Sequence, residues 1–357
     1  MSVSTLATAV EHELTTFFAS RRAQTTRVDP LFTEAARALE EFVLRGGKRV
    51  RPSFAWWGWR GAGGDPDGPE ATRVLRACSA LELIQACALV HDDLMDDSDT
   101  RRGFPTVHTE FTQRHRDMGW HGDAERFGLA AAVLLGDLAL AWADDMLRAA
   151  DLPAPALARA LPFWESMRTE MLGGQYLDVS ADARRDETPE AALRIDRFKT
   201  AAYTIERPLH LGGALAGGSP EMMAAYSCFG ADIGVAFQLR DDLLGVFGDP
   251  EVTGKPAGDD LREGKRTLLV ALALQRADAT EPATAALLRR SLGRTLDADT
   301  IAELRRALVR LGAVDEVEQR ITELTASGLA AMDTDLVEPL ARKELQAMAE
   351  SATSRSY

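Results

Sequence analysis

Two clusters of aspartates carry the clearest chemical signal in this sequence. The first lies in HDDLMDDSDTRRG, residues 91–103, and the second ends the run GVAFQLRDD, residues 234–242. Asp92 and Asp96 are four residues apart, so a helix would place both carboxylates on one face. Like charges placed this way repel each other unless a cation binds between them. Carboxylates without Cys or His favour a hard cation, so the first cluster predicts a Mg²⁺ site.

Basic residues follow both acidic clusters. Arg101 and Arg102 come directly after the first, and guanidinium groups can bind diphosphate oxygens bidentately. After the second cluster, a glycine-rich segment carries Lys255 and Lys265, which such a loop could fold over a phosphate. It is not a Walker loop, because the sequence GxxxxGK[ST] is absent. Acids and basic groups together predict a site where a metal and cations bind a phosphorylated substrate.

Each cluster also has a purely structural interpretation. The first could be a solvated acidic helix end, but the segment before it, residues 77–90, is nearly all apolar. The acids would therefore lie at the entrance to a buried apolar region. The second could be an acidic turn with surface lysines, and the residues alone leave that alternative open.

Long apolar segments precede or contain both clusters and must position them. Ala71–Asp97, Phe127–Ala150 and Met222–Phe247 have the length and apolar content of buried helices, and no alternating β-branched run stands out. Two acid-tipped helices that face each other would enclose a cavity with carboxylates on both rims. We predict an all-α chain forming a single domain over residues 1–357, with an N-terminal helix or arm over 1–25 and a frayed tail over 351–357.

Composition limits the classes of partner and compartment. The formal net charge of −14 argues against nucleic acid and against an anionic membrane surface. The three cysteines fit neither a zinc site nor a full disulfide framework. The N-terminus lacks an apolar signal core, and the apolar stretch Gly128–Ala143 is interrupted by Asp137, which makes it too short to span a bilayer. We therefore expect a cytoplasmic protein without a transmembrane segment.

Several motifs together resemble one family, the trans-prenyltransferases or polyprenyl (isoprenyl) diphosphate synthases, and most of all the geranylgeranyl diphosphate synthases. The resemblance covers about Arg45 to Arg266. Its motifs are GGKRVRP at 46–52, DDLMD at 92–96 with RRG at 101–103, GGQYLD at 173–178, KT at 199–200 and FQLRDD at 237–242. The second aspartate motif departs from the family pattern, because Gly245 replaces a third aspartate. Whether Asp259 or another nearby acid compensates stays open at this point.

The resemblance implies an isoprenoid-synthase-type helical bundle around a central cavity, forming a homodimer. It implies that Mg²⁺, as three ions with substrate bound, supports head-to-tail condensation of isopentenyl diphosphate with an allylic diphosphate, namely the dimethylallyl, geranyl or farnesyl compound. The implied metal ligands are Asp92, Asp93, Asp96, Asp241 and Asp242. Residues similar to those at the allylic diphosphate site are Arg101, Lys199, Thr200, Gln238, Lys255 and Lys265. Those that resemble the isopentenyl diphosphate site are Gly47, Lys48, Arg51, Gln85 and Arg102.

The apolar residues before the first motif bear on product length. A helical turn rises about 5.4 Å, which is comparable to one isoprene unit. Cys87 and Ala88 are small and lie about one turn before Asp92, so the cavity is expected to extend past them, to a twenty-carbon product with Ile84 or Leu81 as its floor. Alternatively, the small pair only packs against a neighbouring helix. The alternative functions are a farnesyl or longer-chain synthase, a class I terpene cyclase and a non-catalytic regulatory subunit.

Overall fold

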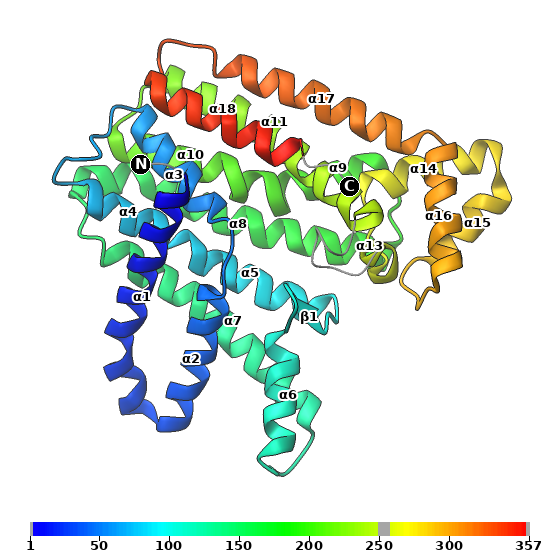
Figure 1. Cartoon of the computed structure of the whole chain (residues 1–357), viewed down its shortest axis with the longest axis horizontal. Helices are drawn as coiled ribbons and strands as arrows, with labels where there is room; N and C mark the ends of the chain where they lie inside the picture. Colours follow the sequence, from blue (N-terminus) through cyan, green and yellow to red (C-terminus); the bar gives the residue numbers. More distant parts are fainter. Residues whose placement is uncertain (1–2, 249–257, 355–357) are drawn as a thin grey trace. The chain divides into compact units, whose positions relative to one another are not determined.

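The computed structural model describes residues 3–248 and 258–354, and within these ranges nearly all regular structure is helical (Figure 1). The exception in the described residues is one antiparallel pair, β1 (Thr100–Arg101) with β2 (Phe104–Pro105). The all-α prediction is confirmed. The short β pair forms directly after the first acidic cluster, where it turns the chain back and holds Arg101 and Arg102 at a tight reversal.

The chain packs as two compact units. Unit 1 comprises residues 1–163 and 208–219, and unit 2 comprises residues 164–207 and 220–357. Each unit contains one of the two aspartate clusters, and each is described below by itself.

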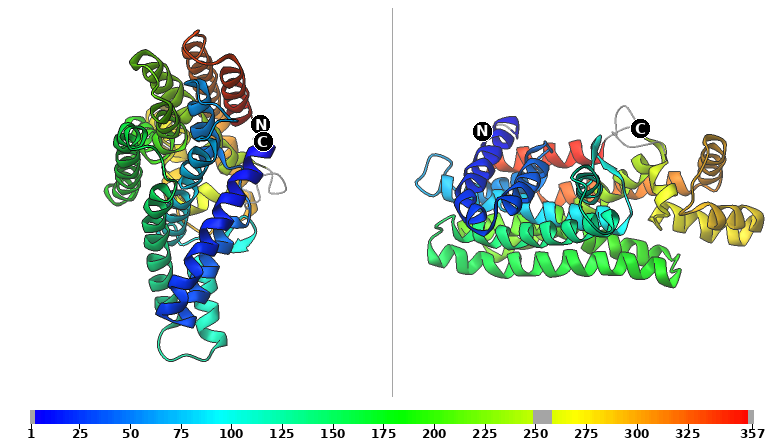
Figure 2. Two further views of the ribbon diagram at one scale, coloured as in Figure 1. Left: turned by 90° about the vertical axis from the view of Figure 1, so that its left-hand side faces the viewer. Right: turned by 90° about the horizontal axis from the view of Figure 1, so that it is seen from below.

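Unit 1 is built on helix pairs from the first half of the chain. Its helices are α1 (Val3–Val28), α2 (Pro30–Leu44), α3 (Val50–Gly61), α4 (Ala71–Ser79), α5 (Leu81–Met95), α6 (Val107–Asp117), α7 (Ala124–Arg148), the start of α8 (Ala154–Arg184) and most of α10 (Arg207–Ala216). Asp29 separates α1 from α2 and caps α2 by accepting a hydrogen bond from the Leu31 N–H, with Pro30 at the first helical position. The two helices therefore run side by side (Figure 2).

Helix α5 forms the centre of unit 1 and ends in the first acidic cluster. It packs against α7, which in turn packs against α6. Leu81, Leu83 and Ile84 of α5 are fully buried, as expected of the apolar segment that precedes the acids. Burial of about 1.5–3 kcal/mol per large apolar side chain anchors this helix, so its acidic end has a fixed position within the unit.

Unit 2 is organised around α11 (Pro220–Phe247), which ends in the second acidic cluster. The other elements are the rest of α8, α9 (Pro189–Ile195), the π-helix η1 (Asp196–Glu206), α13 (Asp259–Glu263), α14 (Leu268–Thr280), α15 (Pro282–Ser291), α16 (Ala298–Arg310), α17 (Ala313–Ala331) and α18 (Pro339–Thr353). Helix α11 packs against both η1 and α17, and α14 continues its core through Leu268, Leu269 and Leu272. The second cluster is thus also anchored by a buried apolar helix.

The ends of the chain depart in part from expectation. The expected N-terminal arm is helix α1. The expected tail begins later than Ser351, because α18 continues to Thr353, whose side chain is buried and whose carbonyl accepts a hydrogen bond from Arg240 Nε at 2.9 Å. Residues 355–357 lie outside the described residues.

Among the residues that the structure describes, three helical stretches are long and apolar enough to cross a membrane: Ala71–Met95, Ala124–Arg148 and Pro220–Phe247. Helix α7 extends the apolar stretch Gly128–Ala143 to 25 residues and contains an 18-residue window of mean hydropathy 1.6, so the prediction that this stretch is too short to span a bilayer is wrong. A single aspartate, Asp137, does not end a helix whose neighbours are apolar on both sides. Each stretch contains an 18-residue apolar window, of which 72% in the first stretch, 39% in the second and 44% in the third is buried inside the protein.

Candidate functional site

The first acidic cluster occupies the last turn of α5 in unit 1. Arg101 bridges two of its carboxylates, with its guanidinium 2.6 Å from Asp93 Oδ1 and 3.5 Å from Asp92 Oδ2. Asp93 is buried, whereas Asp92 and Asp96 are partly exposed, on the face that the spacing predicts. Arg101 thus ties together two carboxylates of the cluster, while Asp92 and Asp96 remain partly exposed to solvent.

A glycine-rich basic segment, residues 46–52, lies near the arginines that follow this cluster; it is called the basic loop below, and its last three residues begin helix α3. Gly46 and Gly47 have φ of 106° and 138°, which only glycine adopts readily. Arg102 donates from Nη1 to the Gly46 carbonyl at 2.7 Å, and a Cβ on Gly47 would lie 3.2 Å from the same nitrogen. The structure thus brings together Gly47 and Arg102, two of the residues predicted for isopentenyl diphosphate. Lys48 is exposed and Arg51 half-buried in the same segment.

The face of α5 above Asp92 contains the residues predicted to control product length. Gln85 and Ala88 are partly exposed on this face, and Ile84, one turn before Ala88, is fully buried. Cys87 lies elsewhere: its Sγ is 3.7 Å from His91 Nδ1, and His91 in turn contacts the Val133 carbonyl of α7 at 3.2 Å. Burial raises the pKa of the Cys87 thiol to about 12, and the Asp137 carboxylate adds to this. Cys87 therefore packs toward α7, whereas Ala88 shares the Asp92 face.

In unit 2, the second acidic cluster surrounds the buried Asp242. Gln238 donates from Nε2 to Asp242 Oδ1 at 2.6 Å, and Oδ2 is a buried oxygen without a hydrogen-bond partner among the described residues. Burial raises the pKa of the Asp242 carboxyl well above its usual range, and the Asp196 and Asp260 carboxylates raise it further. Asp241 is exposed beside it. The carboxyl groups of Asp242, Asp196 and Asp260 thus disfavour one another's ionised forms, so a bound cation would stabilise the ionised carboxylates.

Asp260 fills the space left by the departure at position 245. A Cβ built on Gly245 would lie 1.9 Å from Asp260 Oδ2, so no larger residue fits there while Asp260 keeps its place. Asp260 is 6% exposed, and Lys265 Nζ lies 3.6 Å from its Oδ1 and 2.7 Å from Glu263 Oε2. Of the two nearby acids, Asp260 is therefore the one that stands against α11. Lys255 lies outside the described residues.

The π-helix η1 places Lys199 and Thr200 in unit 2. Lys199 Nζ binds Asp178 Oδ2 at 2.6 Å, and Thr200 is partly buried beside it. Asp196, in the first turn of η1, is buried, and burial together with the nearby Asp178 carboxylate raises its pKa to about 8 although Lys199 opposes the shift. Sequence reasoning missed Asp178 and Asp196. Asp178 ends the GGQYLD motif and Asp196 lies three residues before Lys199, which were the available signals.

The donor chemistry of these residues fits magnesium ions that also bind substrate. Within the described ranges, no three His, Cys, Asp or Glu side chains converge to hold an ion by themselves. Mg²⁺ commonly takes one or two carboxylates and completes its shell with water and substrate phosphates. Carboxylates at the end of α5 and the orphaned buried oxygen of Asp242 are oxygen donors of this kind. The residues thus fit ions bound jointly by protein and a phosphorylated substrate.

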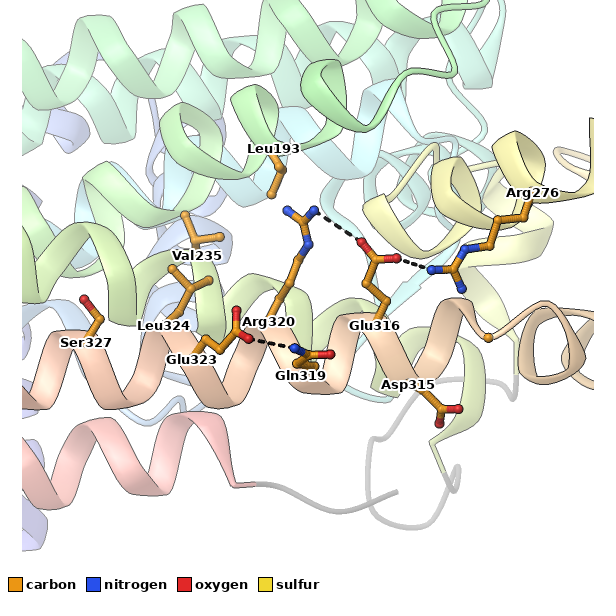
Figure 3. A pocket seen from close by; sticks show the side chains of 11 residues that line it. Leu193, Val235, Arg276, Asp315, Glu316, Gln319, Arg320, Glu323, Leu324 and Ser327 are labelled. Carbon is orange, nitrogen blue, oxygen red and sulfur yellow. Dashed lines mark hydrogen bonds and ion pairs between the residues drawn. The ribbon is translucent and has the colours of Figure 1, made fainter. Parts of the chain in front are cut away.

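Unit 2 contains a hollow of about 780 Å³ (Figure 3). None of the predicted site residues that the structure describes lines it. Glu316 lies between Arg276 and Arg320 and forms ion pairs with both, so these charges already have partners (Figure 3).

Comparison with known proteins gives consistent relatives. A family model described as polyprenyl synthetase matches residues 33–308. A crystal structure of geranylgeranyl pyrophosphate synthase from Corynebacterium glutamicum, complexed with isoprenyl diphosphate and magnesium, is 48% identical with a TM-score of 0.96 and 100% coverage of both chains. A short chain isoprenyl diphosphate synthase of Methanothermobacter thermautotrophicus is 37% identical over 68% of this chain and 67% of its own. A geranylfarnesyl diphosphate synthase of Natronomonas pharaonis is 33% identical over 80% of this chain and 76% of its own.

Proposed function

The chain belongs to the polyprenyl synthetase family and is an isoprenyl diphosphate synthase, and from this premise we propose that its product is geranylgeranyl diphosphate. The observation that carries the proposal is the small, partly exposed Ala88 on the Asp92 face of α5, with Ile84 buried one turn deeper. A cavity that extends past Ala88 accommodates one more isoprene unit than one closed at that level. The 48% identical Corynebacterium glutamicum structure is also named a geranylgeranyl pyrophosphate synthase.

The acidic clusters are proposed to bind the ions that activate the allylic diphosphate. Asp92, Asp93 and Asp96 in unit 1 and Asp241 and Asp242 in unit 2 are the proposed ligands. Three magnesium ions, when bound, would neutralise the leaving diphosphate as its C–O bond breaks. Arg101, now paired with Asp92 and Asp93, is released for the diphosphate when cations take over the carboxylates.

The remaining basic residues bind the two substrates. Lys199, Thr200, Gln238, Lys255 and Lys265 are proposed for the allylic diphosphate, and Gly47, Lys48, Arg51, Gln85 and Arg102 for isopentenyl diphosphate. Basic groups that hold isopentenyl diphosphate orient its double bond, which supplies the electron pair for the new C–C bond to the allylic carbon. A proton then leaves the neighbouring carbon and passes to the released diphosphate. Apolar side chains such as Ile84 exclude the water that would quench the allylic cation.

We further propose that the two units act as one catalytic domain in a cytoplasmic homodimer. Helix α7 exposes Leu129, Val133 and Leu134 at 44%, 43% and 68%, an apolar stripe that a second copy would cover. The net charge of −14 disfavours an anionic membrane surface as the cover.

A matched pair of aspartate variants tests the proposed chemistry. Asp92→Asn removes a proposed metal ligand, whereas Asp97→Asn neutralises an exposed aspartate five residues later that has a left-handed φ of 52°, which Asn also tolerates. Incorporation of labelled isopentenyl diphosphate with a farnesyl diphosphate primer should fall on the order of 10³-fold in Asp92→Asn and less than about twofold in Asp97→Asn. Chelation by EDTA should stop turnover of the wild type. Equal losses in both variants would contradict the assignment of Asp92.

A further inference from the structure

Arg49, inside the basic loop, differs from its neighbours in being buried. Lys48 is exposed, whereas the Arg49 side chain is 2% exposed. Arg49 caps the start of α3 in the left-handed conformation, with φ 49° and ψ 41°, and its carbonyl accepts hydrogen bonds from both the N–H and the hydroxyl of Ser53. A non-glycine residue stays in this conformation only when its surroundings hold it there. Arg49 is not among the residues that the family resemblance assigns to either substrate.

The side chain of Arg49 is held by two acids from different helices. Nη1 donates to Glu82 Oε2 at 2.6 Å, and Nη2 lies 3.3 Å from Glu11 Oε1. The Glu82 side chain is 8% exposed, so this pair is nearly removed from water, whereas that of Glu11 is 43% exposed. Glu82 lies in the first turn of α5, where the helix dipole also favours a carboxylate. The ion pair therefore connects the basic loop to the helix that ends in Asp92.

Glu82 also faces the wider group of cations at this end of unit 1. Burial lowers the pKa of the Arg102 guanidinium, Glu82 opposes that shift, and the neighbouring arginines at 101, 49 and 51 reinforce it. Arg102 is itself tied to the loop through the Gly46 carbonyl. Arg102 thus lies close enough to several other guanidinium groups for their charges to repel it, and Glu82 is a buried carboxylate that attracts it.

We propose that the buried Arg49–Glu82 ion pair is a positioning device for the isopentenyl diphosphate site. It holds residue 49 in the left-handed conformation, so that Lys48 on one side and Arg51 on the other are presented to the same diphosphate. The assignment rests on the proposed function of the basic loop. Neither Arg49 nor Glu82 is proposed to contact substrate. Both act through Lys48, Arg51 and Arg102.

Two physical effects predict opposite results when Glu82 loses its charge. Coulomb attraction alone predicts that Glu82→Gln binds diphosphate more tightly, because a negative charge near the cations is gone. If the ion pair positions the loop, Glu82→Gln should instead bind diphosphate more weakly. Arg49 would become a poorly compensated buried charge, and residue 49 would leave its left-handed conformation. Positioning dominates here, because Glu82 forms the closer and more buried of the two ion pairs that hold Arg49.

The test compares Glu82→Gln with a matched control in the same unit. Glu13, whose side chain is 8% exposed and binds Arg76 Nε at 2.9 Å, forms a similar ion pair between α1 and α4. In Glu82→Gln, KM for isopentenyl diphosphate should rise about tenfold while KM for farnesyl diphosphate stays within about twofold. Glu13→Gln should lower the melting temperature comparably and leave both KM values unchanged. Calorimetric binding of isopentenyl diphosphate without primer should show the same loss in Glu82→Gln.

Further variants keep the test decisive if Glu82→Gln folds poorly. Arg49→Lys keeps the charge but cannot reach both acids, so it should also raise KM for isopentenyl diphosphate selectively. Glu82→Asp, which retains the carboxylate, should recover part of the affinity. Unchanged or tighter isopentenyl diphosphate binding in Glu82→Gln, or equal rises in both KM values, would overturn the inference. Wild-type protein without any turnover would instead count against the proposed function itself.

Discussion

At the scale of single residues, Asp260 takes the space that a side chain at position 245 would need. Its Oδ2 would lie 1.9 Å from a Cβ on Gly245, and its carboxylate raises the pKa of the nearby Asp242. A carboxylate from another segment therefore stands where the family pattern has an aspartate on the same helix. Gly245 and Asp260 are thus expected to be coupled, so that neither can change without consequence for the other.

A double-mutant cycle tests this coupling. Gly245→Ala should lower the free energy of unfolding by about 1–3 kcal/mol, because the added methyl group displaces a short, buried side chain. Combining it with Asp260→Ala should recover at least about 1 kcal/mol relative to the sum of the single changes. Urea unfolding of the four proteins measures this. Strictly additive losses would show that Asp260 does not occupy the space beside Gly245.

The sequence predicts which acidic residues form the two clusters, but not which groups pair with them or pack against them. Asp92 and Asp96 follow from helical spacing, and the departure at Gly245 is visible in the motif. Which of the two adjacent acids, Asp259 or Asp260, turns toward α11 depends on the short helix α13. Arg49 and Glu82 are 33 residues apart, and only the packing of unit 1 brings them together.

At the scale of elements, the π-helix η1 and its contact with α8 decide where Lys199 lies. A Cβ on Gly174 of α8 would be 2.2 Å from the backbone nitrogen of Lys199, so α8 and η1 touch directly at this point. Helical periodicity predicts a helix here but cannot distinguish a π-helix from an α-helix. The sequence identifies the GG pair in GGQYLD only as part of a motif. The structure explains why residue 174 must be glycine, since a side chain there would collide with η1.

The neighbouring glycines provide a matched pair of variants. Gly174→Ala should destabilise the protein by about 2–3 kcal/mol and raise KM for the allylic diphosphate, because backbone rather than a mobile side chain must move. Gly173→Ala meets no atom within 4 Å and should be neutral or stabilising by up to about 1 kcal/mol, since alanine favours helices. Thermal melting and steady-state kinetics check both. Similar effects at the two positions would contradict the close contact of α8 with η1.

At the scale of the whole molecule, the all-α class was predictable from long apolar segments and scarce strand signals. The division into two units was not. Two boundaries, after residues 163 and 207, fall within helices α8 and α10, so no Gly- or Pro-rich linker marks them, whereas the third follows the GGS segment at 217–219. A helix that continues across a boundary looks the same in sequence as one inside a single unit.

The exposed stripe on α7 predicts that the protein is a dimer in solution. Leu134→Glu places a charge in the stripe and should convert the dimer to a monomer, because burying an unpaired carboxylate opposes association. Val309→Glu is the matched control, since Val309 is 52% exposed on α16, outside the stripe. Sedimentation velocity should give a dimer for the wild type and Val309→Glu. A monomeric wild type, or a Leu134→Glu variant that stays dimeric, would refute this interface.

Product length is the most direct measurement of what this enzyme does. Purified protein with Mg²⁺, isopentenyl diphosphate and, separately, dimethylallyl, geranyl or farnesyl diphosphate should yield mainly the twenty-carbon diphosphate by mass spectrometry. We expect this result because the small Ala88 and the buried Ile84, one turn deeper on α5, are proposed to set the length of the substrate cavity. A dominant fifteen-carbon product would place the floor at the level of Ala88, and much longer chains would show no floor near Ile84. Either outcome would contradict the proposed product.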